Sequence, residues 1–240
     1  MNFCGGHRYS LRVPAWTPTC ACSLTSPLYR MNRRTVDAPP EKVADAAYDI
    51  DDVFRRRWSP RAFADRPVEP EKIRRMLEAA RWTMSSYNEQ PWRYVVATKE
   101  DEEDYDALLN CLIDGNQEWA RLAPVLMMSF VKTTFDRNDK DNRCAEHDVG
   151  AASAALTFQA TSMGLYVHQM AGIRADVACE TFDVPDDVEP MAGLAVGYLG
   201  DPERLPEGRR AAERRPRSRE PLSAFVFEGQ WGDAAELVAA

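Results

Sequence analysis

The sequence predicts a fold of the α+β or α/β class built on one mixed sheet, and three observations lead to that prediction. The chain has 240 residues, of which 45% are hydrophobic and 28% charged, enough for one large domain or two small ones with a substantial core. Short apolar or β-branched runs alternate with longer stretches of helical periodicity. The helical stretches are in excess, which favours a single sheet with helices packed around it.

The first elements are predicted to be two helices separated by a loop. Residues 41–57 carry apolar side chains at helical spacing and therefore predict a helix. Pro60 and Pro67 indicate a loop over residues 58–69. A second helix is expected to begin at Pro70, because proline is favoured at the first helical position. Its apolar face consists of Ile73, Met76, Leu77 and Ala80.

Strands and helices then alternate. The β-branched, aromatic or continuously apolar runs predict strands over residues 92–98, 124–131, 165–168 and 191–199. Helices are expected over residues 100–113, 149–163 and 175–182. The 149–163 segment is small and apolar almost all round, so it is either the centre of the core or a helix shared between two subunits.

Residues 201–221 form an arginine-rich arm with seven arginines, five acidic residues and four prolines. The prolines argue against a long helix, so we expect a solvated, extended segment. Nucleic-acid binding is the alternative, but the five acids dilute the basic charge. Residues 222–227 return to apolar character, so the arm is expected to dock again, and arginines held in this way suit an anionic ligand.

The charge excludes several function classes. Thirty Lys and Arg against 38 Asp and Glu give a net charge of −8, whereas a general nucleic-acid or membrane-surface binder would be basic.

The sequence also lacks several functional signals. No apolar run is long enough to span a bilayer. Neither of the glycine-rich phosphate-loop patterns occurs. The cysteines lack the spacing of a metal site, so we expect no bound metal. We also expect the cysteines to be reduced thiols, as in a cytoplasmic protein.

The first thirty residues differ from the rest, because they contain no Asp or Glu and several prolines. They have no apolar stretch suited to a secretory signal, and the prolines oppose the amphipathic helix of a transit peptide. We therefore expect residues 1–36 to be a disordered or artefactual extension, with a targeting segment as the alternative.

Three separate segments have side chains suited to binding anions or heterocycles. They are the arginine-rich stretch 55–63, the polar loop 85–92, and residues 217–219 of the arm. Each alone also fits a surface charge run, a turn or a linker. Together and in order, with three more segments, they resemble the nitroreductase family of FMN-dependent oxidoreductases. The matching segments are RRWSPRAF (56–63), SSYNEQPWR (85–93), NQEWARLAPVLM (116–127), HDVGAASAALTFQATSMGL (147–165), HQMAGI (168–173) and PRSREPLSAFVFEGQWG (216–232).

The resemblance implies an α+β, nitroreductase-like fold with a central mixed, mainly antiparallel sheet flanked by helices. It implies an intertwined homodimer with a C-terminal arm and two FMN sites at the subunit interface. On this interpretation residues 37–232 are the nitroreductase domain, residues 201–232 are its extended arm, and residues 233–240 are a tail.

The resemblance also implies the residues that bind the cofactor. Arg57 and Ser59, with Arg217 and Arg219, match positions that hold the FMN phosphate, which suits guanidinium chemistry. Arg61 matches the basic residue beside flavin N1 and O2, where a cation stabilises the reduced flavin. The other matching positions are Trp58, Asn116 at the pyrimidine edge, Met170, Ala171 and Gly172 near N5, and Ser85, Ser86 and Asn88 from the other subunit. The sequence departs from the best-known members at Trp58, Trp119 and Ala171.

The implied activity is hydride transfer from NADH or NADPH to flavin N5 and then to an electron-poor acceptor, a nitroaromatic or a quinone, by a ping-pong mechanism. The alternative is an FMN-binding protein of the same fold without nicotinamide turnover, for flavin storage, sensing or degradation. No side chain is assigned as a certain catalytic residue, because the flavin carries the chemistry. His147 and His168 are interpreted as structural. The expected partners are a second copy of the chain and a small-molecule acceptor, with no nucleic acid and no membrane.

Overall fold

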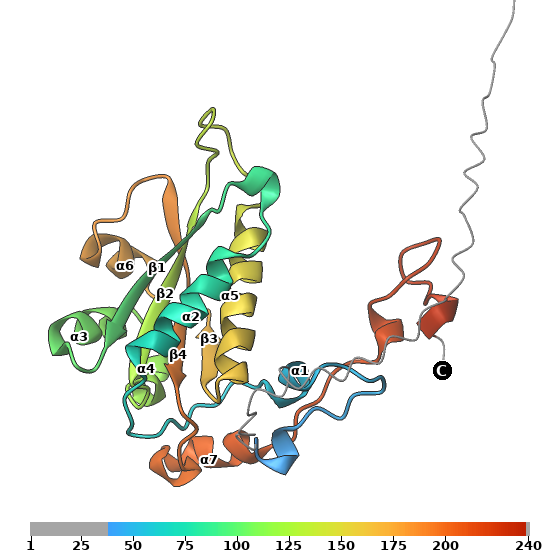
Figure 1. The fold of residues 1–240 in the computed structure, drawn as a ribbon, viewed down its shortest axis with the longest axis horizontal. Helices are drawn as coiled ribbons and strands as arrows, with labels where there is room; N and C mark the ends of the chain where they lie inside the picture. The colour runs from blue at the N-terminus through green and yellow to red at the C-terminus, as the bar shows by residue number, and fades with distance from the viewer. Residues whose placement is uncertain (1–37, 239–240) are drawn as a thin grey trace, which may run out of the picture. The chain divides into compact units, whose positions relative to one another are not determined.

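A computed structural model describes residues 38–238, all within one unit of the chain, and confirms the α+β class (Figure 1). The predicted extension over residues 1–36 lies outside the described residues. No helix in the described range is both long and apolar enough to cross a membrane.

The sheet contains the four predicted strands: β1 (Trp92–Thr98), β2 (Val125–Lys132), β3 (Tyr166–Met170) and β4 (Val188–Gly197). Their order is β1-β2-β4-β3, and every pairing among these strands is antiparallel. The sheet was expected to be mixed and mainly antiparallel, and the described strands contain no parallel pair.

Helices cover both faces of the sheet (Figure 1). One face packs against α2 (Pro70–Arg81) and α5 (Ala145–Ser162), and the other against α3 (Glu102–Asn110), α4 (Asp114–Ala120) and α6 (Ala175–Thr181). Strand β2 shows why its sequence is continuously apolar: Leu126 and Met128 enter one core cluster while Val125 and Met127 enter the other.

Helix α5 confirms the helix expected over residues 149–163. Ala152, Leu156 and Ala160 lie in the core, whereas Ala151 and Phe158 on the other side are only partly covered. Gly150 is exposed, and a Cβ built on it would meet nothing within 4 Å. Much of the apolar surface that suggested a shared helix is therefore incompletely buried within this chain.

The helix predicted over residues 41–57 is wrong. The structure has a three-residue 3-10 helix, Pro40–Lys42, and a short helix α1 (Asp52–Arg56), with non-helical backbone between them. The segment instead folds back, because the Ala44 amide donates to the Arg55 carbonyl at 2.9 Å. The Asp51 side chain caps α1 by accepting from the Val53 amide. Of the apolar residues that suggested a helix, Ala47, Ile50 and Phe54 are exposed.

Two other segments differ from the prediction. The helix expected over residues 100–113 is confirmed as α3 but ends at Asn110, because the backbone of residues 111–113 pairs with residues 172–174. Helix α4, which follows at Asp114, was not predicted. The arm was expected to be extended, yet it contains helix α7 (Glu207–Arg214). Pro206 and Pro216 lie just outside that helix and bound it instead of preventing it. Leu222 and Phe225, which were expected to dock, are exposed.

Candidate functional site

Three arginines from distant parts of the sequence are brought together. Arg57 follows α1, and Arg217 and Arg219 follow α7. Arg217 Nη1 donates to the carbonyls of Lys42 at 3.0 Å and Arg55 at 2.8 Å, which ties the arm to the segment before Arg57. Arg57 Nη1 lies 3.4 Å from Ser59 Oγ. The four residues predicted to hold a phosphate therefore belong to one region of the fold.

The charges of this arginine cluster are not neutralised by the protein. Burial lowers the pKa of Arg57, and the charge of Arg219 lowers it further. Burial also lowers the pKa of Arg217, with further lowering by Arg57 and Arg219. None of the three forms an ion pair with a carboxylate in the part of the chain that the structure describes. Three adjacent cations without a counterion suit a bound dianion such as a phosphate.

A second group surrounds Arg61. Its guanidinium carbon lies 5.7 Å from the ring centroid of Trp119, whose ring is 4.5 Å from that of His168. His168 Nδ1 lies 2.9 Å from the Pro60 carbonyl oxygen, so Nδ1 carries the proton and donates it. Burial lowers the pKa of His168 to about 4, and the charge of Arg61 also contributes. His168 is therefore neutral near pH 7, in agreement with a structural role.

Three buried side-chain donors, on Trp58, Arg61 and Trp119, lack an acceptor among the described residues. Arg61 Nε, Trp58 Nε1 and Trp119 Nε1 are buried with no hydrogen-bond partner among the described residues. Buried donors are normally paired, so an unpaired group of this kind is suited to a ligand with acceptor atoms. The carbonyl oxygens and ring nitrogens of a flavin are acceptors, and the donor set fits such a group. Trp58 is itself a core residue, packed against Tyr166 and beneath Lys42.

Asn116 and Gly172 are in direct contact. Asn116 Nδ2 donates to the Gly172 carbonyl at 3.0 Å. A Cβ on Gly172 would lie 2.5 Å from Asn116 Nδ2 and 2.6 Å from the Ile113 side chain. The glycine was expected to allow close approach to a flavin; a larger residue would also have to displace the Asn116 and Ile113 side chains. Its neighbours differ, because Met170 is buried and Ala171 is exposed.

The loop that carries Ser85, Ser86 and Asn88 lies apart from the arginine cluster. The Ser86 amide donates to Asp148 Oδ2, near the start of α5, at 2.8 Å. Phe54 in α1, just before Arg57, instead packs on Phe158 with ring centroids 4.4 Å apart. These two attachment points are ten residues apart, or about 15 Å along the helix at about 1.5 Å per residue. One chain therefore does not bring all of the predicted cofactor residues together.

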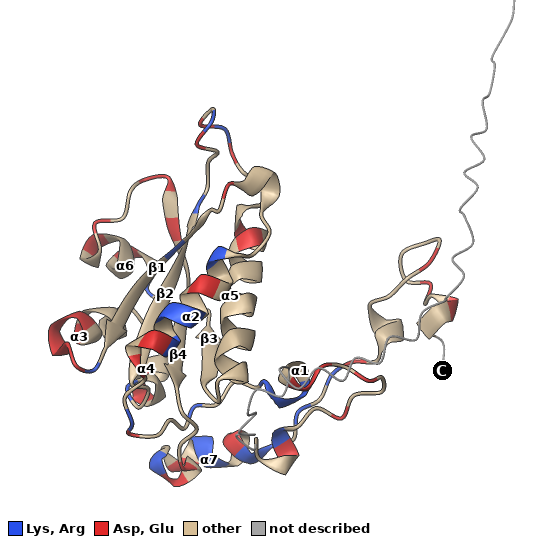
Figure 2. Cartoon of the chain, in the orientation of Figure 1, with Lys and Arg blue, Asp and Glu red and all other residues tan. Residues whose placement is uncertain are grey.

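Sequence reasoning missed Glu213, which was counted among the solvated acids of the arm. It is only 2% exposed, and its Oε1 accepts from the amides of Arg61 at 2.8 Å and Ala62 at 3.0 Å. Figure 2 shows that basic residues gather on and beside α7, where this carboxylate lies, whereas acidic residues line α3. The sequence carried no signal for this contact, which joins residues far apart in the chain.

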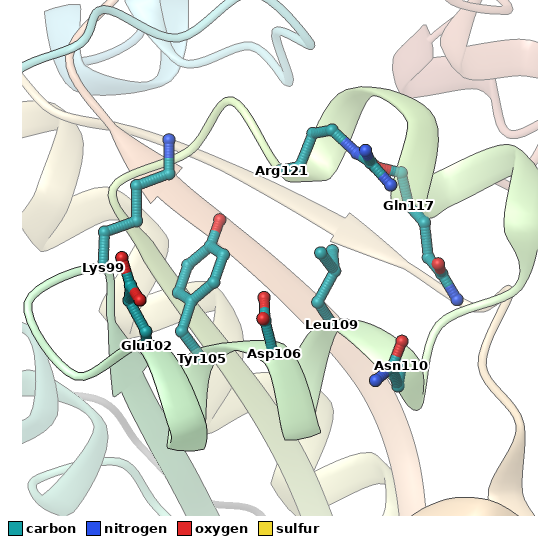
Figure 3. Close-up of a pocket in the computed structure, with 8 residues that line it drawn as sticks. All are labelled: Lys99, Glu102, Tyr105, Asp106, Leu109, Asn110, Gln117 and Arg121. Atoms are coloured by element: carbon teal, nitrogen blue, oxygen red, sulfur yellow. The ribbon is translucent and has the colours of Figure 1, made fainter.

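A pocket elsewhere has a volume of about 540 Å³ and is lined by α3, α4 and Lys99 (Figure 3). Glu102 and Asp106 bring negative charge to it, while Lys99 and Arg121 bring positive charge. The lining therefore selects no ligand charge, and none of the predicted cofactor residues belongs to it. Among the described residues no cluster suited to a metal ion is present, and Cys111, Cys144 and Cys179 are free thiols.

Comparison with known proteins gives concordant matches. A family model described as the nitroreductase family matches residues 54–198. A solved structure described as an oxidoreductase containing FMN is 37% identical, with a TM-score of 0.74 over 78% of this chain and 96% of that one. An uncharacterised 15.4 kDa protein of Mycolicibacterium smegmatis is 36% identical over 55% of this chain and 87% of its own length. The protein of Bacillus subtilis named FMN reductase (NAD(P)H) is 26% identical over 59% of this chain and 62% of its own length.

Proposed function

The chain belongs to the nitroreductase family, and we propose that it is an FMN-dependent oxidoreductase that uses NADH or NADPH. The observation that carries this proposal is the cluster of Arg57, Arg217 and Arg219, which has no carboxylate partner among the described residues. The names of the two relatives that mention FMN support the choice of anion.

The arginine cluster would bind the phosphate of FMN. Guanidinium groups donate several hydrogen bonds in a fixed planar geometry and keep their charge at all physiological pH values. Ser59 Oγ, beside Arg57, would add a neutral hydrogen bond. The contacts of Arg217 with two backbone carbonyls fix its position before the ligand arrives, which reduces the entropic cost of binding.

Arg61 and Asn116 would face the pyrimidine edge of the ring system. Bound FMN would supply the centre that accepts a hydride and passes it on. The contribution of Arg61 is a fixed positive charge where negative charge develops on reduction, and such a charge raises the reduction potential. Neutral His168, held by its bond to the Pro60 carbonyl, adds no competing charge beside Arg61.

We also propose that the working unit is a homodimer. The loop with Ser85, Ser86 and Asn88 attaches to α5 about 15 Å from the attachment of α1, at about 1.5 Å per residue, and on this proposal it would serve the site of the partner. Tyr48, Ile50 and Phe54 are exposed apolar side chains beside the site, and surface of this kind is typical of a subunit interface.

The nicotinamide and the acceptor would occupy the same place in turn, in a ping-pong cycle. The acceptor class we propose is an electron-poor compound, either a nitroaromatic or a quinone. A cytoplasmic location is part of the proposal and rests on the free thiols Cys111, Cys144 and Cys179.

Spectroscopy of the purified protein tests this function. We expect a yellow protein whose visible absorption is bleached by NADH or NADPH without air and returns when a quinone is added. A yellow protein that neither nucleotide bleaches would instead support an FMN-binding protein without nicotinamide turnover. A colourless protein that does not bind added FMN would contradict both functions.

A further inference from the structure

The buried carboxylate of Glu213 connects the C-terminal arm to the loop that carries Arg61. Its Oε1 accepts from two consecutive amides, those of Arg61 and Ala62, at 2.8 and 3.0 Å. The side chain is 2% exposed, and its second oxygen, Oε2, is buried without a hydrogen-bond partner in the described chain. A buried carboxylate with one unsatisfied oxygen is costly, so its presence calls for an explanation beyond surface charge.

The loop depends on such contacts because it has no regular secondary structure around Arg61. The Pro60 carbonyl accepts from His168, and the Ala62 carbonyl accepts from the Gly200 amide at 2.9 Å. The Phe63 carbonyl accepts from Arg204 Nη1 at 2.9 Å. Glu213 supplies the acceptor for the amides of Arg61 and Ala62, and so holds the backbone at Arg61 itself.

Helix α7, which carries Glu213, is fixed from several directions. Arg209 donates to Glu118 Oε2 and to the Gly115 carbonyl, both at 2.7 Å, and thereby attaches α7 to the helix that carries Asn116. After α7, the Arg215 carbonyl accepts from Lys42 Nζ, and Arg217 joins the arginine cluster. A displacement of Glu213 would therefore disturb the Arg61 loop while the arm remained attached elsewhere.

We propose that Glu213 is a positioning residue, which fixes the backbone of Arg61 so that its guanidinium is held at the flavin ring. The carboxylate does not touch the cofactor and acts through the Arg61 and Ala62 amides. The flavin part of this inference rests on the proposed function, but the fixing of the two amides does not, because both contacts belong to the protein alone.

The experiment compares Glu213→Ala and Glu213→Gln with the wild type, with Glu207→Ala as control. Glu207 is an exposed acid in the same helix whose side chain forms no hydrogen bond or ion pair with the described residues. Hydrogen–deuterium exchange of the apoprotein reports on the amides of residues 61 and 62. Titration with FMN and the midpoint potential of the bound FMN report on the site.

In Glu213→Ala we expect faster exchange of both amides, an FMN dissociation constant raised at least about tenfold, and a more negative midpoint potential. Glu213→Gln should stay near the wild type, because its amide oxygen can accept the same two bonds. Glu207→Ala should change nothing. If Glu213→Ala does not fold, Glu213→Asp, one methylene too short to reach both amides, carries the test with the same expected changes.

Unchanged amide exchange, or unchanged FMN affinity and potential, in Glu213→Ala would overturn the inference. Equal damage in Glu213→Gln and Glu213→Ala would also overturn it, because the negative charge and not the acceptor geometry would then matter. A wild-type protein that fails to bind FMN refutes the proposed function instead, and exchange of the two amides still decides whether Glu213 fixes the loop.

Discussion

Acidification should destabilise this protein through His168, and the effect tests the geometry beside Arg61. The imidazole donates from Nδ1 to the Pro60 carbonyl and packs on Trp119. Burial is the main reason that its pKa lies at about 4 instead of the ordinary 6.5, and the charge of Arg61 acts in the same direction. Between pH 6.5 and pH 4, His168 therefore binds a proton in the unfolded chain but stays neutral in the folded chain.

The size of the effect follows from this difference. Wherever the unfolded state binds more protons than the folded state, the free energy of unfolding decreases as the pH is lowered, by about 1.4 kcal/mol per pH unit for one group. The loss begins near pH 6.5 and ends near pH 4, so the full effect is about 3 kcal/mol. Between pH 7.5 and pH 5.0 the share of His168 is about 2 kcal/mol.

Urea unfolding of the wild type and His168→Gln at these two pH values measures that share. Glutamine keeps an N–H donor for the Pro60 carbonyl but does not titrate, so acidification should cost the wild type about 2 kcal/mol more than the variant. His147→Gln is the control, because His147 is an exposed histidine. Equal losses in wild type and His168→Gln would show that His168 is not buried as the structure describes.

Three further predictions follow from other contacts. Gly200→Ala should lower the free energy of unfolding by about 1–3 kcal/mol in urea, because its Cβ would lie 2.3 Å from the backbone carbonyl carbon of Phe63. Gly208→Ala, where a Cβ meets nothing within 4 Å, should not lower it, and equal effects would contradict the packing. Inorganic phosphate should raise the melting temperature of the apoprotein more than chloride does at equal ionic strength, because phosphate should bind the arginine cluster of the folded state. An identical response to both salts would argue against an anion site there. Ile50→Asp should convert a dimer to a monomer in light scattering, and a monomeric wild type would refute the proposed interface.

Sequence patterns predicted correctly those elements, such as the strands of the sheet, whose apolar residues are buried within this chain. Strand β2 is nearly continuously apolar and contributes side chains to the core clusters on both faces of the sheet, so its sequence pattern and its central position agree. The 41–57 segment shows the limit of such patterns. Its apolar residues have helical spacing, yet Ala47, Ile50 and Phe54 are exposed in the chain, so their spacing did not indicate a helix that faces the core. Exposed apolar residues can therefore have the same helical spacing as residues that pack in the core.

The candidate site was predictable only where residue type alone indicates chemistry. Arginines suit a phosphate, so Arg57, Arg217 and Arg219 could be proposed as one set, and the structure places them near one another. Glu213 could not be found in this way, because an acid in an arginine-rich arm is ordinarily solvated. Its burial follows from a helix in that arm and from a contact across 152 positions.

The preference for FMN over riboflavin tests the central claim most directly, because the two ligands differ only by the phosphate that the arginine cluster is proposed to bind. We predict that the wild type binds FMN much more tightly than riboflavin. In Arg57→Ala/Arg219→Ala the FMN dissociation constant should rise about tenfold to a hundredfold, because charge-assisted hydrogen bonds are lost, while riboflavin affinity stays the same. Arg215→Ala is the matched control, because that exposed side chain forms no hydrogen bond or ion pair with the described residues. A double variant that keeps the full preference for FMN would contradict the account.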